Sequence, residues 1–284
     1  MRTASSVASA TTDTLPGVEI RVARHYEGPP GMTNGGWACG LAAGLLTGPD
    51  TPPGTAVEVT LRAPVPLDTP IRGERSGDSA FLVGVDPAGD GASPAGPDRS
   101  GDGALVQARL LTAEERAALV PPPAFVPLAA ARHAGSPDVC VRTPFPTCYV
   151  CGPDREGGLH ITIGPVATGG SGGGGAVATG GSAGVGAAAF AGVWAPPSAL
   201  GDLPLRYLWA ALDCPTGLVH LTGGGKALLG RLTMVPHRAP VRGEPLVVVA
   251  AATGSDRRKR FATAALYTPD AELVAQSVAT WITI

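Results

Sequence analysis

The tetrapeptide Arg62-Ala63-Pro64-Val65 occurs a second time in this chain, as Arg238-Ala239-Pro240-Val241. Each copy follows an apolar segment with the composition of a strand, and each precedes an Arg-Gly-Glu triplet, at 72–74 and at 242–244. Matching residues that keep the same neighbours in the same order are hard to attribute to chance. The sequence therefore predicts an internal repeat, with two units of similar fold.

The segments around each copy predict the same order of elements. One apolar helix precedes it, at 35–48 in the first half and at 204–217 in the second, where Pro215 and Gly217 are expected to end the helix. Strands follow, the last of them at 104–112 and 272–284. Because helices this apolar are normally enclosed on most sides, each half is expected to be an α+β unit, a curved antiparallel sheet around one central helix.

Domain boundaries follow from segments that cannot contribute to a core. Residues 86–104 and 167–188 consist mainly of small residues, turn formers and aspartates, so they bury too little apolar area to offset the entropy of ordering them. We expect both to be loop insertions. The proline-rich stretch at 121–147 has the composition of a linker. The predicted organisation is an N-terminal unit at 14–125, a linker at 126–147 and a C-terminal unit at 148–284.

The overall composition excludes several classes of protein. Of the 284 residues, 44% are hydrophobic and 15% charged, which is typical of a folded chain, and a net charge of −2 provides no field that attracts nucleic acid. No apolar stretch has the length of a membrane span or the position of a signal-peptide core. We therefore expect a cytoplasmic protein without nucleic-acid or membrane partners. Its five cysteines, an odd number, argue against a disulfide framework.

Two segments resemble a known family. Residues 148–159, CYVCGPDREGGL, resemble the CF-x-CGP-(D/E)-N-P-x-GL sequence that precedes the first strand in many hot-dog thioesterases; that strand would lie at 160–166 here. Residues 25–36, HYEGPPGMTNGG, are similar to the segment that leads into the family's His-Gly-Gly helix start. The resemblance covers most of 18–112 and 148–284. It implies a double hot-dog, two fused units of the fold.

The resemblance also implies a catalytic site. In the family, a glycine pair at a helix N-terminus polarises the thioester carbonyl, because free N–H groups and the helix dipole suit a developing oxyanion. A carboxylate about two turns into the helix of the partner unit acts as general base or nucleophile. Here Asn34-Gly35-Gly36 matches the first piece, with Asn34 in place of the histidine, and Asp213 matches the second.

Each half has only one of the two pieces. The carboxylate position of the first helix falls near Ala43, and the second helix starts with Gly201-Asp202-Leu203-Pro204, which has no glycine pair. A fused pseudo-dimer would place Asn34-Gly35-Gly36 opposite Asp213 and form one composite site. Simpler roles stay open, since Asn34 could only cap its helix and Asp213 could reach solvent at a helix end.

The resemblance therefore implies hydrolysis of an acyl-CoA or acyl-carrier-protein thioester, without metal or redox cofactor, by a monomeric pseudo-dimer or a homo-oligomer of it. The alternative is an acyl-CoA-binding or regulatory protein whose catalysis has lapsed, as the absent histidine suggests. A hot-dog dehydratase would need an Asp and His pair at a spacing that the sequence does not provide.

The cysteines allow one further hypothesis. Cys148 and Cys151 form a single Cys-x-x-Cys pair, with Cys140 and His160 as further candidate metal ligands. One such pair is a weak signal, since structural zinc takes four ligands, and redox pairs normally open a helix after a strand. A turn with half-buried thiols and less than stoichiometric zinc is favoured. Cys214, with no histidine placed near it by the sequence, is expected to be a core residue.

Overall fold

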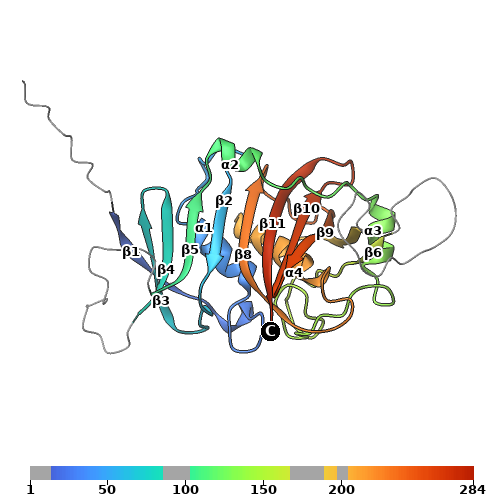
Figure 1. Ribbon diagram of the computed structural model, residues 1–284, viewed down its shortest axis with the longest axis horizontal. Helices are drawn as coiled ribbons and strands as arrows, with labels where there is room; N and C mark the ends of the chain where they lie inside the picture. Colours follow the sequence, from blue (N-terminus) through green and yellow to red (C-terminus); the bar gives the residue numbers. More distant parts are fainter. Residues whose placement is uncertain (1–13, 86–102, 167–188, 197–203) are drawn as a thin grey trace, which may run out of the picture.

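The computed structural model describes residues 14–85, 103–166, 189–196 and 204–284 (Figure 1). The predicted insertion at 167–188 and most of that at 86–104 lie outside the described residues, as does the expected helix start at 201–203.

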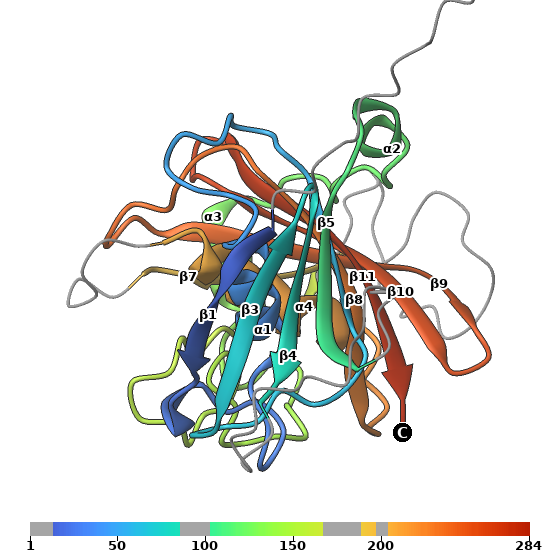
Figure 2. The same cartoon turned by 90° about the vertical axis from the view of Figure 1, so that its left-hand side faces the viewer.

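The described strands form one antiparallel sheet, in the order β1-β3-β4-β5-β2-β8-β11-β10-β9-β7-β6. Figure 2 shows one end of this sheet, with β1, β3, β4 and β5 side by side. Along the chain, the strands are β1 (Thr14–Arg21), β2 (Val57–Leu61), β3 (Pro70–Ser76), β4 (Ser79–Gly84), β5 (Ala104–Leu110), β6 (Gly164–Val166), β7 (Ala189–Trp194), β8 (Ala227–Pro236), β9 (Leu246–Asp256), β10 (Lys259–Tyr267) and β11 (Leu273–Thr283). The strand predicted at 160–166 is thus confined to its last three residues.

The sheet has the same connectivity on both sides of its centre. β2 pairs with β8, and each is the second strand of a five-stranded unit. Outward from this pair come the fifth, fourth, third and first strands of each unit: β5, β4, β3 and β1 on one side, β11, β10, β9 and β7 on the other. The two Arg-Ala-Pro-Val sequences follow the two central strands, β2 and β8. The Arg-Gly-Glu triplets are not equivalent, however: 72–74 lies within β3, whereas 242–244 lies in the turn before β9. The division into the predicted domains stays a prediction.

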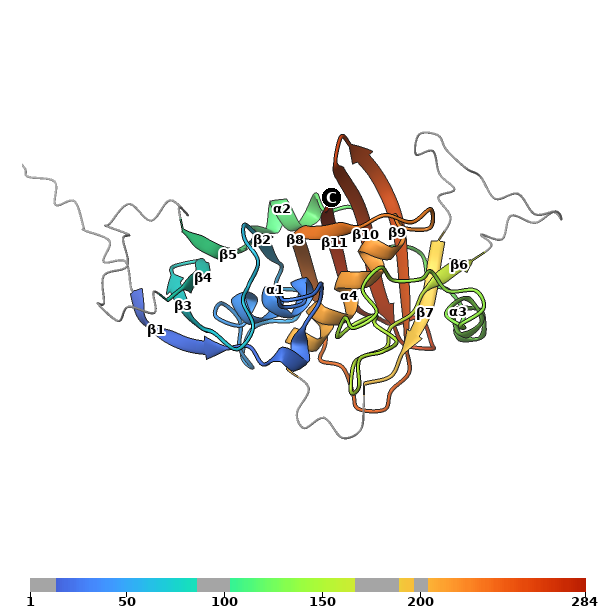
Figure 3. The ribbon, with the colours of Figure 1, turned by 90° about the horizontal axis from the view of Figure 1, so that it is seen from below.

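Two helices lie inside the curve of the sheet (Figure 3). α1 (Gly35–Ala43) contacts β2, β4 and β5, α4 (Arg206–Leu218) contacts β8 to β11, and the helices contact each other. Their axes approach closely because α1 is built from small residues. A Cβ on Gly36 would lie 2.5 Å from Cβ of Asp213, and one on Gly40 would lie 2.8 Å from Cα of Arg206.

The second helix ends within one residue of the predicted position, at 217, but the residues expected to end it do not do so. Pro215 and Gly217 lie inside α4, which continues to Leu218. Proline removes one backbone donor and normally breaks a helix, but all residues from Tyr207 to Leu218 are buried. We attribute the continued helix to this enclosure, because packing outweighs the lost hydrogen bond.

The remaining described helices are short. α2 (Ala113–Ala117) begins with a capping box formed by Thr112 and Glu115. α3 (Leu128–Ala134) lies in the segment predicted as a linker, and it packs on β7 through the buried Ala131. A 3-10 turn spans Arg24–Tyr26. Among the described residues, no helix has both the length and the apolar character needed to cross a membrane.

Candidate active site

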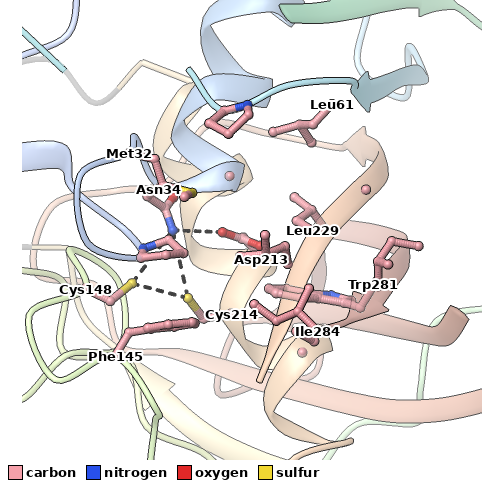
Figure 4. A pocket seen from close by; sticks show the side chains of 18 of the residues that line it. Met32, Asn34, Leu61, Phe145, Cys148, Asp213, Cys214, Leu229, Trp281 and Ile284 are labelled. Carbon is pink, nitrogen blue, oxygen red and sulfur yellow. Dashed lines mark hydrogen bonds between the residues drawn. The ribbon is translucent and has the colours of Figure 1, made fainter. Parts of the chain in front are cut away.

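Asn34 joins the start of α1 to the middle of α4. It is the N-cap residue of α1, and its Oδ1 accepts a hydrogen bond from the N–H of Trp37 at 2.9 Å. Its Nδ2 donates to Oδ2 of Asp213 at 2.8 Å. The cap fixes the orientation of the amide, so that its nitrogen points toward the carboxylate (Figure 4).

Asp213 receives a second hydrogen bond from the same helix end. The N–H of Gly36 donates to Oδ2 of Asp213 at 2.8 Å. This is one of the N–H groups that lack a partner within a helix, and the positive end of the helix dipole favours an anion there. The structure therefore brings together Asn34, Gly36 and Asp213, from parts of the chain about 180 residues apart.

The two oxygens of Asp213 have different surroundings. Oδ2 accepts both hydrogen bonds, whereas the buried Oδ1 has no hydrogen-bond partner among the described residues. The side chain does not reach solvent at a helix end, because the residue is only 1% exposed. Burial raises the pKa of Asp213 to about 7, against the opposing hydrogen bond from Gly36; the neighbouring Cys148 raises it further and Asn34 lowers it.

Asp213 forms part of the wall of a cavity of about 260 Å³, here called the Asp213 cavity. Its wall also includes Asn34 and Gly35 at the start of α1, and three cysteines, Cys148, Cys151 and Cys214. The rest is mainly apolar and is supplied by several elements, with Met32, Leu61, Phe145, Leu229, Trp281 and Ile284 labelled in Figure 4. An apolar cavity with a few convergent polar groups is the usual form of a small-molecule site.

Gly35 differs from Gly36 in its contacts. A Cβ on Gly35 would lie 3.0 Å from Leu229 and 3.6 Å from Oδ2 of Asp213, so the backbone approaches the carboxylate closely. The N–H of Gly35 donates to no group among the described residues, whereas that of Gly36 is taken by Asp213. Of the predicted glycine pair, only Gly35 has an uncommitted N–H.

A hydrogen-bonded chain holds the backbone of α4 beside the carboxylate. Trp281 Nε1 donates to Oγ1 of Thr216 at 2.8 Å, and that hydroxyl donates to the carbonyl oxygen of Asp213 at 2.6 Å. The Trp281 ring also packs against Gly217, where a Cβ would lie 2.8 Å from it. The sequence did not single out Trp281 or Thr216 as candidates. No local motif marks either residue, since β11 and α4 meet only in the folded chain.

The predicted cysteine candidates separate into two groups. The sulfur atoms of Cys148, Cys151 and Cys214 lie within 4.8 Å of one another, and all three residues are buried. Burial was expected for Cys214, whereas Cys148 and Cys151 were expected to be half-buried. Cys140 and His160, the other candidate ligands, are not part of this group. The sequence could not bring Cys214 to the pair, because it lies 63 residues after Cys151.

Comparisons with known proteins identify the fold. No family model and no curated protein sequence matches this chain. Solved structures do match it: a provisionally assigned thioesterase II from Thermobifida fusca YX has a TM-score of 0.57 at 15% identity, covering 94% of this chain and 91% of that one. The tesB protein of Mycobacterium avium subspecies paratuberculosis has a TM-score of 0.56 at 13% identity, covering 94% and 92%.

A protein of unknown function with a hot-dog fold from Alicyclobacillus acidocaldarius matches with a TM-score of 0.53 at 15% identity, over 94% of this chain and 92% of its own. At such identities the likeness concerns the fold. The chain therefore has a hot-dog fold, as the resemblance at 148–159 predicted.

Proposed function

We propose that this protein is a double hot-dog thioester hydrolase with one composite active site between its two halves. The observation that carries the proposal is the asymmetry of the Asp213 carboxylate. One oxygen is held by Asn34 and Gly36 at the start of α1, while the other is unpartnered in an apolar cavity. A buried carboxylate is costly unless it is paired or functional, and here half of it is unpaired.

In this mechanism Asp213 is the general base and Asn34 is a positioning residue. Oδ1 accepts a proton from a water molecule, whose oxygen attacks the thioester carbonyl. The carbonyl oxygen becomes an oxyanion, which accepts a hydrogen bond from the uncommitted N–H of Gly35. Collapse of the tetrahedral intermediate breaks the carbon–sulfur bond, and the proton passes from Asp213 to the departing thiolate. The products are a carboxylic acid and a free thiol.

The raised pKa of Asp213 suits this role. A general base works best when its pKa lies near the operating pH, and burial brings the pKa of this carboxyl to about 7. Gly36 and Asn34 keep Oδ2 occupied, so that the proton is taken at Oδ1. Attack by Oδ1 itself on the carbonyl is the other route that this geometry allows.

The proposed substrates are acyl-CoA or acyl-carrier-protein thioesters in the cytoplasm. The cavity of about 260 Å³ is slightly smaller than the usual range for ligand sites, which favours a short acyl group. The wall also contains Arg62, a cation suited to the phosphates that both carriers contain. The proposed assembly is a monomeric pseudo-dimer or a homo-oligomer of it.

A second candidate is an acyl-CoA-binding protein without catalysis. The hydrogen bond from the N–H of Gly36 to Asp213 favours this candidate, because it leaves only one N–H of the glycine pair to stabilise an oxyanion.

The deciding experiment is release of free thiol from a panel of acyl-CoA thioesters, short to long and aliphatic to aromatic, with acyl-carrier-protein thioesters in parallel. We expect release from at least one member, with a preference for short acyl groups. Binding of acyl-CoA without any thiol release across the panel would overturn the hydrolase and establish the second candidate.

A further inference from the structure

Three cysteine sulfurs from two segments meet at the wall of the Asp213 cavity. Cys148 and Cys151 lie in the turn that opens the second half, and Cys214 lies in α4. Cys148 Sγ and Cys214 Sγ are 3.7 Å apart, and they face each other in Figure 4. The proposed hydrolysis uses none of these thiols.

The spacing of the sulfurs matches a metal site. With metal–sulfur bonds of about 2.3 Å, two thiolates of a tetrahedral zinc site are roughly 3.8 Å apart. The pair Cys148 and Cys214 already has this separation, and Cys151 lies within 4.8 Å of both. Only a small adjustment of side chains would bring all three to bonding distance.

The turn that carries two of the thiols is closely folded. The N–H of Gly152 donates to the carbonyl oxygen of Cys148 at 2.8 Å, and a Cβ on Gly152 would lie 2.5 Å from that oxygen, so only glycine fits. The turn is also anchored to the first half. The N–H of Tyr149 donates to the carbonyl oxygen of Glu27, and Arg155 forms a largely buried ion pair with the Glu27 carboxylate at 2.7 Å.

The side chain of Asn34 also contacts two of the sulfur atoms. Its Nδ2 lies 3.9 Å from Sγ of Cys148 and 3.9 Å from Sγ of Cys214. A hydrogen-bond donor beside these sulfurs suits the thiolate, which is the form of cysteine that binds a metal ion.

We propose that Cys148, Cys151 and Cys214 bind one Zn²⁺ ion, with the fourth coordination position facing the Asp213 cavity. A closed structural site would have four protein ligands, whereas a site with three leaves a position for water or a ligand. All three cysteines belong to the wall of the cavity, so the open position lies on that side. Soft thiolate ligands select zinc over magnesium or calcium.

The simplest rival is a group of small core side chains, for which free cysteines are well suited. This explains burial, but it does not require that three sulfur atoms from two segments lie within 4.8 Å of one another at the wall of a cavity. A Cys148–Cys214 disulfide is the other rival, since the same contact would allow it.

The test measures metal binding without substrate, so its outcome is separate from that of the hydrolase proposal. The full chain is reduced, freed of metal and titrated with Zn²⁺, and with Co²⁺ as a spectroscopic probe. We expect one equivalent of zinc to be retained on dialysis, and one equivalent of cobalt to give thiolate charge-transfer absorption.

Single Cys148→Ser, Cys151→Ser and Cys214→Ser variants should each weaken zinc binding about a hundredfold or more, because even loss of an outer partner of a metal ligand costs ten- to a hundredfold. Cys140→Ser is the matched control and should bind zinc as the natural chain does. If a serine variant does not fold, alkylation of the cysteines in the natural chain, with and without zinc, tests the same ligands. Zinc should then protect Cys148, Cys151 and Cys214 from the reagent and leave Cys140 reactive.

Three outcomes would overturn the proposal. One is a reduced, folded chain that retains no zinc. Another is equal zinc binding by the chain with all three serines. The third is a Cys148–Cys214 disulfide that forms even in the presence of zinc.

Discussion

The interface between α1 and α4 has a cavity near the start of each helix, and the two cavities differ in chemistry rather than in size. The Asp213 cavity, of about 260 Å³, adjoins the start of α1. The second, the Arg206 cavity, has a volume of about 330 Å³ and adjoins the start of α4. Its described wall consists of Ile20, Arg21, Val22, Tyr26, Trp37, Leu41, Pro204, Arg206 and Tyr207.

The helix starts explain the difference. α1 begins with a capping asparagine and a glycine close to α4, and the facing residue is Asp213. α4 begins after Leu205, whose side chain makes no capping hydrogen bond. The guanidinium group of Arg206 lies over the ring of Trp37, with Cζ 5.4 Å from the ring centroid. No carboxylate is part of the described wall of the Arg206 cavity. Similar cavities within one fold therefore need not share a function, since the few polar groups decide it.

The largest expected effect is on turnover in Asp213→Asn. If Asp213 is the general base, thioester hydrolysis should fall by about a hundredfold to ten-thousandfold, because the amide cannot accept the proton. Arg206→Met, in the other cavity, is the control and should leave kcat within about twofold, since it keeps the aliphatic stem. Full activity in Asp213→Asn would assign the chemistry to another group.

The same aspartate should make stability depend on pH. Its pKa is about 7 in the folded chain against an ordinary value of 3.8, so the native state retains a proton that the unfolded chain has released. As pH rises from 4 to 7, this group should lower the free energy of unfolding by up to about 4 kcal/mol. Urea unfolding at a series of pH values, with a chelator present, measures this free energy. Asp213→Asn should remove the pH dependence. If the free energy of unfolding changes with pH in the same way in both proteins, the prediction is contradicted.

Turnover should change with pH in the opposite direction to the free energy of unfolding. Only the ionised form of Asp213 accepts a proton, so kcat should rise with pH and reach half of its plateau near pH 7, where burial places the pKa. The profile is measured between pH 5 and 8 with a chelator present. A flat profile between pH 5 and 8 would argue against a base with this pKa.

Substitutions at two glycines of the helix interface should distinguish an effect on stability from an effect on activity. Gly36→Ala adds a methyl group that meets Asp213, and Gly40→Ala adds one that meets Arg206. Each should cost about 1–3 kcal/mol of stability through overpacking. Only Gly36→Ala should also reduce kcat, by about tenfold or more, because it displaces the carboxylate. Equal activity in the two folded variants would mean that the two cavities are not functionally different.

The smallest effect is expected from a helix cap. Asn34→Ala should cost about 1 kcal/mol of stability from the lost cap and should also lower kcat, since Oδ2 of Asp213 loses one of its two donors. Thr112→Ala, which removes the cap of α2, is the matched control with a similar stability cost. If both variants keep full kcat, Asn34 is only a cap, as the simpler interpretation of the sequence allows.

Much of the fold could be predicted from local features of the sequence. The two helices follow from their apolar composition and the strands around the repeated Arg-Ala-Pro-Val sequence from alternation, and residues 148–159 indicated the hot-dog fold. The errors lie where tertiary packing overrides local preference. Pro215 was expected to end α4, but the surrounding sheet keeps the helix intact. The second Arg-Gly-Glu triplet was paired with the first, although it lies in a turn.

For the candidate site, the sequence alone determined which residues the proposal uses: Asn34 and the glycines at one helix start, and Asp213 in the other helix. Their chemical types are written in the chain, and a helix start exposes N–H groups wherever it occurs. Only the tertiary structure decided that Gly36 holds Oδ2, that Oδ1 is unpartnered, and that Cys214 joins Cys148 and Cys151. These contacts join residues 63 to 177 positions apart. Their geometry depends on how closely α1 and α4 pack, which no local pattern encodes.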